Sequence, residues 1–128
     1  KCVTKKFRIH GYRKNPDLTD HMYVYGSDEP KILRLIEQEP ALGEKLSQKF
    51  GYTLAEVVWA VREEMAITLE DVLARRVRML FVDAREAMAA APKAAAVMAR
   101  ELGRDQAWID EQVKSFTDLA KNYIFEQK

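Results

Sequence analysis

The chain has 128 residues, 48% of them hydrophobic and 32% charged, which suits one globular domain and argues against a disordered segment. No run reaches the roughly 18 apolar residues that a membrane span requires, and no secretory signal begins the chain. Its one cysteine, Cys2, cannot form an internal disulfide, which fits a reducing compartment such as the cytoplasm.

The formal net charge of +1 is unevenly distributed. Residues 1–14 contain no acidic residue and six basic ones: Lys1, Lys5, Lys6, Arg8, Arg13 and Lys14. The remainder has 15 basic and 20 acidic residues, a net charge of −5. Because such a body repels a phosphate backbone, we expect no nucleic-acid partner. The basic end could contact an acidic partner or anionic lipid, but we favour its interpretation as a solvated end.

The first predicted element is an extended arm. Phe7, Ile9 and Tyr12 alternate with polar residues, the period of a half-buried strand, and Gly11 and a turn at residues 15–17 end it. A lone strand either packs on a helix or is the remnant of a sheet in another domain. We therefore divide the chain into an extended basic arm or linker, residues 1–17, and a helical domain, residues 18–128. Because the chain does not begin with Met, we expect it to be a piece of a longer protein.

Helical patterns follow the arm. A helix begins at residues 27–30, with a proline in its first turn, and Pro40 ends it. A short amphipathic segment with Leu42 and Leu46 comes next. Thr53 and Glu56 then form a capping box. The apolar face predicted for the helix that this box opens comprises Leu54, Val57, Val58, Val61 and Met65.

Three more helix starts are marked by capping residues, at Thr68, Asp83 and Asp105. Pro92 either kinks the helix that begins at Asp83 or starts a new one, and Gly103 is a helix stop. The pattern predicts an all-α fold: a compact, orthogonal-type bundle of six to eight helices with an extended N-terminal arm.

The sequence offers little for catalysis. The five glycines lie too far apart for a phosphate-binding loop, which excludes a dinucleotide fingerprint and a Walker loop. Cys2, His10 and His21 lack the spacing of a zinc site, and the absence of later histidines excludes a di-metal carboxylate bundle. We assign no catalytic, cofactor-binding or metal-binding residue to this chain.

One polar cluster remains as a candidate site: Glu64, Asp71, Arg75, Arg76 and Arg78. Arg76 shares a helical face with apolar residues, so we expect it to pair with Glu64, and its replacement by alanine to cost about 3 kcal/mol if the pair is buried. The cluster could clamp an anionic substrate. We favour a structural role, in which it fixes helix register or docks a neighbouring domain. A DNA-binding role for its arginines is disfavoured by the charge of the body.

Several segments resemble the carboxy-terminal domain of flavin-dependent (aerobic) glycerol-3-phosphate dehydrogenases. The resemblance covers roughly residues 18–125, and its most specific part is Glu-x-x-x-Thr-x-x-Asp-x-Leu-x-Arg-Arg, from Glu64 to Arg76. Val77 and Arg104 depart from the threonine and tryptophan that are common in the family. Further matching segments are residues 25–27, 32–36, 53–57, 61–66, 81–85, 91–92 and 98–103.

The resemblance implies that the chain is a non-catalytic cap of a larger enzyme. The parent's flavin and substrate domains would hold FAD and oxidise sn-glycerol 3-phosphate to dihydroxyacetone phosphate, passing electrons to a quinone or, in related oxidases, to oxygen. The implied partners are those domains, a second copy in a homo-oligomer, and a membrane at whose cytoplasmic face the parent lies. The alternative is a freestanding helical protein-interaction module.

Overall fold

The computed structural model describes residues 2–125. Lys1 of the predicted arm and residues 126–128 of the predicted helical domain lie outside the described residues. Over that range the elements are helical, apart from one isolated antiparallel bridge between Lys45 and Thr53. The prediction of an all-α fold is confirmed. In chain order the elements are the 3₁₀ helix η1 (His21–Asp28), α1 (Glu29–Gln38), the 3₁₀ helix η2 (Pro40–Gly43), α2 (Leu54–Glu63), the π-helix η3 (Asp71–Arg76), α3 (Met79–Val82), α4 (Ala84–Leu102) and α5 (Gln106–Lys121).

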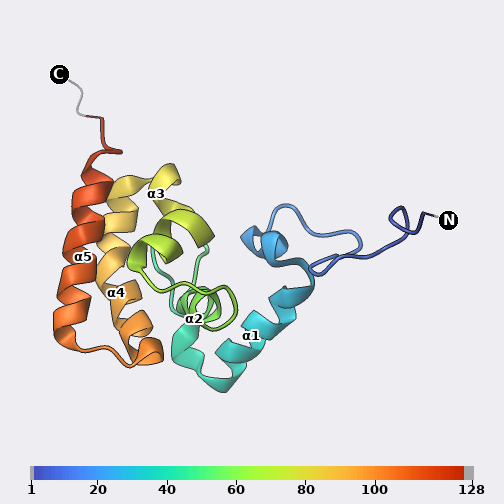
Figure 1. Ribbon diagram of the computed structural model, residues 1–128, viewed down its shortest axis with the longest axis horizontal. Coiled ribbons are helices and arrows are strands. Elements are labelled where there is room, and N and C mark those ends of the chain that lie inside the picture. The colour runs from blue at the N-terminus through green and yellow to red at the C-terminus, as the bar shows by residue number, and fades with distance from the viewer. Residues whose placement is uncertain (1, 126–128) are drawn as a thin grey trace.

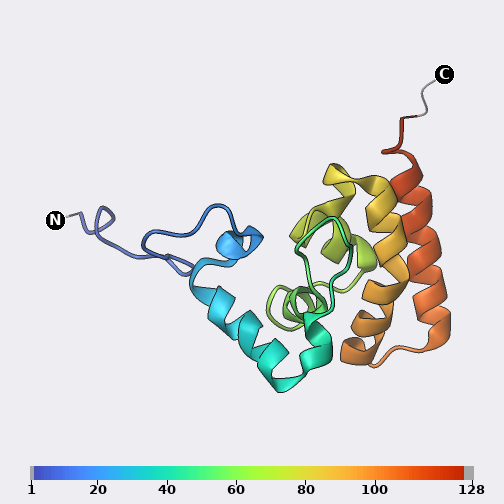
Figure 2. The ribbon, with the colours of Figure 1, turned by 180° about the vertical axis from the view of Figure 1, so that it is seen from behind.

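Helix α2 is the centre of the fold. Its residues 54–60 are all buried, as expected for a helix that is surrounded by other elements. It contacts α1, α4, η2 and η3. Figure 1 shows α2 nearly end-on, whereas α4 and α5 lie side by side in the plane of the view, so α2 crosses them steeply. The view from behind shows the same antiparallel α4–α5 pair at the opposite end of the molecule from the N-terminal arm (Figure 2).

Helix α4 continues through Pro92 without a break. Proline removes one intrahelical hydrogen bond, but packing on both sides holds the helix together. Small side chains let α2 and α5 approach α4 closely. The fully or nearly fully buried alanines of α4 are Ala87, Ala90, Ala91, Ala94, Ala95 and Ala99.

The predicted helix boundaries are confirmed where a capping residue marks them. Thr53 and Glu56 form the capping box of α2. The Asp83 side chain accepts hydrogen bonds at the start of α4, and the Asp105 side chain does so at the start of α5. Gly103, at φ +64°, ends α4 in the left-handed conformation.

The predicted position of Met65 on the buried face of α2 is wrong. Its side chain is 84% exposed. The helix ends at Glu63, and Met65 adopts φ +56°. The amide of Ala66 then donates to the carbonyl of Ala60 at 3.0 Å, so the chain folds back on the last turn of the helix. Sequence periodicity missed this end because the left-handed residue is methionine rather than glycine.

The predicted half-buried strand in the arm is also wrong. Residues 2–20 contain turns and no strand, and the side chains of Phe7, Ile9 and Tyr12 are exposed. An alternating pattern needs a sheet edge to pair with, and residues 2–125 contain no sheet. Figure 1 shows this segment projecting from the helical body.

The end of the arm is nevertheless held by the start of α1. The Ser27 amide donates to the Gly11 carbonyl at 3.2 Å, His10 pairs with Asp28 at 2.6 Å, and Arg13 pairs with Glu29. All three contacts cross the predicted boundary at residue 17. The division into two segments therefore stays a prediction.

Candidate docking surface

A buried carboxylate joins η1 to α2. Glu56 is 1% exposed, and its local role is to accept from the Thr53 amide at 2.7 Å in the capping box. It also contacts His21 at 3.1 Å and accepts from the Tyr25 hydroxyl at 3.1 Å. A buried carboxylate needs such partners to offset the loss of its hydration. These contacts fix η1, and with it the entry of the chain, on the central helix.

His21 lies between two carboxylates. Its Nε2 is 3.1 Å from Glu56 and its Nδ1 is 3.3 Å from Asp20. The hydrogen bond to Glu56 raises the pKa of His21, against the opposing effect of burial, and the charges of Glu56 and Asp20 add to the increase. The ring also packs edge-on against Tyr52, with centroids 5.3 Å apart. Burial raises the pKa of the Tyr25 hydroxyl, so this phenol stays neutral and donates to Glu56.

We predict that stability falls as pH rises through the pKa of folded His21. Since that pKa lies above the ordinary value of 6.5, the folded state binds the proton more tightly than the unfolded state. The stabilisation is fully present below the unfolded pKa and disappears above the folded one. Urea unfolding measured between about pH 5.5 and about pH 9 should show this decline. His21→Gln should remove it, and an equal decline in that variant would assign the effect to another group.

An open, mostly apolar pocket of about 540 Å³ lies above this network. Phe81 is 56% exposed and Val82 62% exposed, although they belong to the same short helix as the buried Met79 and Leu80. Tyr23 and Val24 of η1 are also exposed. The lining residues are His21, Tyr23, Val24, Tyr25, Tyr52, Glu56, Arg76, Val77, Arg78, Phe81 and Val82.

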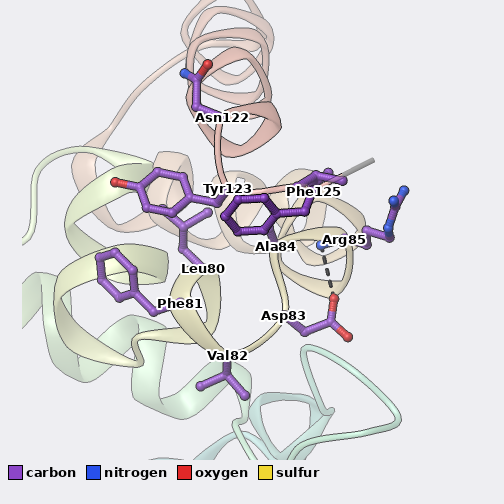
Figure 3. A pocket seen from close by; sticks show the side chains of 10 residues that line it. Leu80, Phe81, Val82, Asp83, Ala84, Arg85, Asn122, Tyr123 and Phe125 are labelled. Carbon is purple, nitrogen blue, oxygen red and sulfur yellow. Dashed lines mark hydrogen bonds between the residues drawn. The ribbon is translucent and has the colours of Figure 1, made fainter. Parts of the chain in front are cut away.

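A second pocket of about 470 Å³ lies on the other side of α3. Figure 3 shows Phe81 and Tyr123 turned toward one another, with Phe125 beside Tyr123. The Phe81 and Tyr123 rings meet edge to face, with centroids 5.6 Å apart. Phe81 and Val82 line both pockets, so the exposed apolar side of α3 borders each of them. Exposed apolar surface of this kind marks an interaction site more often than a solvated one.

The backbone beside the first pocket is irregular at two successive places. Residues Asp71–Arg76 form a π-helix, and Arg78 adopts the left-handed conformation at φ +58°. Both conformations are uncommon for such residues and concentrate at functional sites. Here they place Arg76, Val77 and Arg78 along the pocket wall. Sequence periodicity predicted an ordinary helix in this segment and gave no sign of either feature.

The predicted polar cluster is only partly brought together. Arg75 pairs with Asp71 at 2.7 Å and with Glu70 at 2.6 Å, away from the residues that line the pocket. The Asp71 carboxylate also caps Thr68 through its amide at 2.9 Å and its hydroxyl at 2.8 Å. Hydrogen bonds from Thr68 and Ile67 and the charge of Arg75 lower the pKa of Asp71 despite the opposing effect of its burial. The charged groups of Asp71 and Arg75 therefore both have local partners among the described residues.

The expected pair of Arg76 and Glu64 is present. The Arg76 Nε atom is 3.3 Å from the Glu64 carboxylate, and an Arg76 amino group donates to the Glu64 backbone carbonyl at 2.5 Å. Burial raises the pKa of Glu64, while the charge of Arg76 opposes this. The side chains are 39% and 28% exposed, so the pair is less buried than the sequence suggested. Their expected interdomain role stays a prediction.

This exposure reduces the expected cost of removing the arginine. Arg76→Ala should lower the free energy of unfolding by about 1 kcal/mol rather than about 3 kcal/mol, because water reaches both partners. A double-mutant cycle with Glu64→Gln, measured by urea unfolding, isolates the pair from other contacts. A loss above about 3 kcal/mol would mean that the two charges are effectively desolvated.

The most connected polar group in this region was missed from the sequence. The capping box did identify Glu56, but only as a local helix signal. Its contacts with His21 and Tyr25 join residues 35 and 31 positions apart, and no spacing rule connects them. The described residues contain no group of three or more candidate metal ligands, and none of their helices is long and apolar enough to cross a membrane.

Comparison with known proteins identifies the family. Residues 2–109 match the family model described as the C-terminal domain of alpha-glycerophosphate oxidase. The chain belongs to this family. The recognised resemblance is therefore confirmed, and the helical body described above is a member of the alpha-glycerophosphate oxidase C-terminal domain family.

Curated relatives carry related names. The chain is 29% identical over 120 residues to a probable mitochondrial glycerol-3-phosphate dehydrogenase of Dictyostelium discoideum, covering 93% of this chain and 18% of that protein. It is 33% identical over 119 residues to glycerol-3-phosphate dehydrogenase 2 of Mycobacterium tuberculosis, covering 93% and 20%. It is 34% identical over 122 residues to the human mitochondrial glycerol-3-phosphate dehydrogenase, covering 91% and 16%. The chain thus spans a fifth or less of these relatives. No solved structure matches it significantly.

Proposed function

We propose that this chain is the non-catalytic helical C-terminal domain of an FAD-dependent glycerol-3-phosphate dehydrogenase. The parent would oxidise sn-glycerol 3-phosphate to dihydroxyacetone phosphate and pass the electrons through FAD to a quinone or to oxygen. The observation that carries the proposal is the family match over residues 2–109, supported by relatives that bear the dehydrogenase name.

FAD is assigned to the part of the parent outside this chain. The glycines at positions 11, 26, 43, 51 and 103 are too widely spaced to form a pyrophosphate-binding loop. The pocket above Glu56 also suits a diphosphate poorly, because two of its three cationic side chains, His21 and Arg76, are already paired with carboxylates. We therefore assign this chain no step of the reaction.

Further parts of the proposal concern the parent's surroundings. A second copy of the parent and a membrane at whose cytoplasmic face it lies are the partners that the resemblance implies. The mitochondrial names of the Dictyostelium and human relatives suggest that the compartment differs between organisms. Fractionation of the source cells, with detection by an antibody against this chain, would determine the location.

The first experiment is the mass of the native protein that this antibody detects. We expect a band several times larger than the 14.8 kDa of the chain, and that the purified species carries flavin absorbance and oxidises glycerol 3-phosphate. A band near the mass of the chain would overturn the proposal and leave the freestanding interaction module. A large species without flavin or activity would contradict the enzymatic assignment while leaving the family unchanged.

A further inference from the structure

We propose that the surface formed by Tyr23, Val24, Arg78, Phe81 and Val82, here called the α3 face, docks an apolar and acidic surface of the parent's preceding catalytic region. The inference rests on the proposed function, because that function supplies the occupant. It goes further by assigning the face, the cation at its rim and the chemistry of the partner.

The first argument is the apolar content of α3. Met79 and Leu80 are buried in the body, while Phe81 and Val82 on the same short helix are exposed. A helix that is apolar on all sides is normally covered on all sides. Tyr23 and Val24 line the same pocket and extend the exposed apolar surface onto η1. Tyr123 packs edge-on against Phe81, yet Phe81 and Val82 both stay more than half exposed among the described residues.

The second argument is charge. The one acidic side chain lining the pocket is Glu56, which is buried and engaged by Thr53, His21 and Tyr25. Arg76 is paired with Glu64, whereas the Arg78 side chain forms no ion pair or hydrogen bond with residues 2–125. The unneutralised charge at the rim is therefore positive, and a complementary surface brings a carboxylate to Arg78.

The third argument is the backbone that presents this cation. Arg78 holds φ +58°, a conformation unfavourable for a side chain with a Cβ, directly after a π-helix. Its side chain is exposed and forms no ion pair or hydrogen bond with residues 2–125. Strain of this kind persists where a side chain must be aimed, so the feature points to a contact made outside the described chain.

The preceding region is favoured over a second copy by symmetry and by the path of the chain. A two-fold symmetric contact would place the face against itself, and the face as defined offers no acidic side chain to Arg78 of the other copy. The arm, in contrast, enters the body at residues 10–13, which are tied to residues 27–29 just beyond Tyr23 and Val24. A region joined through this arm is held at high local concentration beside the face.

The test uses the full-length protein that contains this chain, carrying Arg78→Lys. This substitution keeps the positive charge and supplies an amine that a carbodiimide couples to a contacting carboxylate. Mass spectrometry then identifies the partner residue. We expect a link to an aspartate or glutamate that precedes residue 1. A link between two copies, a link within residues 1–128 only, or no link at this position would overturn the inference.

A second measurement tests whether the contact of Arg78 holds the helical domain on the rest of the parent protein. A specific protease site inserted after Thr4 allows the arm to be cut, and gel filtration then shows whether the domain stays attached. We expect the cut wild-type protein to co-elute and Arg78→Gly to raise the dissociation constant at least tenfold. Arg104→Gly, which removes an exposed cation outside the α3 face, is the matched control and should behave as wild type.

Glycine at position 78 accepts a positive φ, so the variant should melt at the wild-type temperature or higher. Co-elution of Arg78→Gly at the wild-type affinity would overturn the inference. The outcomes are separable from those of the proposed function. A full-length protein that lacks flavin but docks its domain through Arg78 would contradict the enzymatic assignment alone. An active enzyme that is indifferent to Arg78 would contradict the docking inference alone.

Discussion

Replacing Gly26 by alanine should lower the free energy of unfolding by about 3 kcal/mol, one of the two largest effects expected for a single substitution in this chain. Gly26 adopts φ +54° and ψ −120°, a conformation that side chains avoid. A Cβ at this position would lie 1.8 Å from the Gly11 carbonyl oxygen, which is backbone and cannot rotate away. The same carbonyl accepts from Ser27, so the substitution would separate the arm from the start of α1.

Gly103→Ala is the matched control. Gly103 also has a positive φ, +64°, but an added Cβ would meet no atom within 4 Å. Its replacement should cost about 1 kcal/mol, the conformational penalty alone. Guanidinium chloride unfolding of both variants separates the steric part of the Gly26 effect from the conformational penalty that the two glycines share. Proteolysis of the arm should accelerate only in Gly26→Ala. Equal losses in the two variants would show that the arm moves away from Gly26 without cost.

The elements that were predicted correctly carry their signals within a few residues. Thr53 with Glu56, Asp83, Gly103 and Asp105 each act on the backbone of their own helix end, so sequence spacing is sufficient to find them. The left-handed Met65 and Arg78 were missed for the opposite reason. Each is a residue that rarely takes a positive φ, and only tertiary packing selects that conformation.

The candidate surface was beyond the reach of local patterns. Phe81 and Val82 carry the same apolar signal as the buried Met79 and Leu80, and sequence cannot tell which side of so short a helix is covered. The polar cluster was found because Glu64, Asp71, Arg75 and Arg76 are close in sequence. Among its members, however, it is Arg78 that lines the pocket without a partner in residues 2–125.

The second large effect is expected at Glu56. Its replacement by alanine should lower the free energy of unfolding by about 3–5 kcal/mol, because one change removes the capping box and leaves His21 and the Tyr25 hydroxyl without their shared acceptor. The space left by the side chain at this buried position adds to the loss. Far-ultraviolet circular dichroism during urea unfolding measures the change.

Glu56→Gln separates charge from shape. The amide keeps the volume and one acceptor oxygen but places an NH₂ group against either the Thr53 amide or the Tyr25 hydroxyl, so we expect a smaller loss of about 2 kcal/mol. The variant should also abolish the fall in stability as pH rises through the pKa of His21. The hydrogen bond to Glu56 is the main cause of that raised pKa. A Glu56→Gln protein that keeps both the wild-type stability and its pH dependence would show that the carboxylate charge does not hold η1 on α2.

The same network links stability to the α3 face. Tyr23 and Val24 lie on η1 between His21 and Tyr25, the two residues that Glu56 holds. Loosening the Glu56 contacts should therefore displace one apolar edge of the face without touching Arg78 or α3. In the cut full-length protein, Glu56→Gln should weaken retention of the domain, because η1 loses part of its attachment to α2. Retention at the wild-type level would place docking on α3 alone and remove η1 from the proposed face.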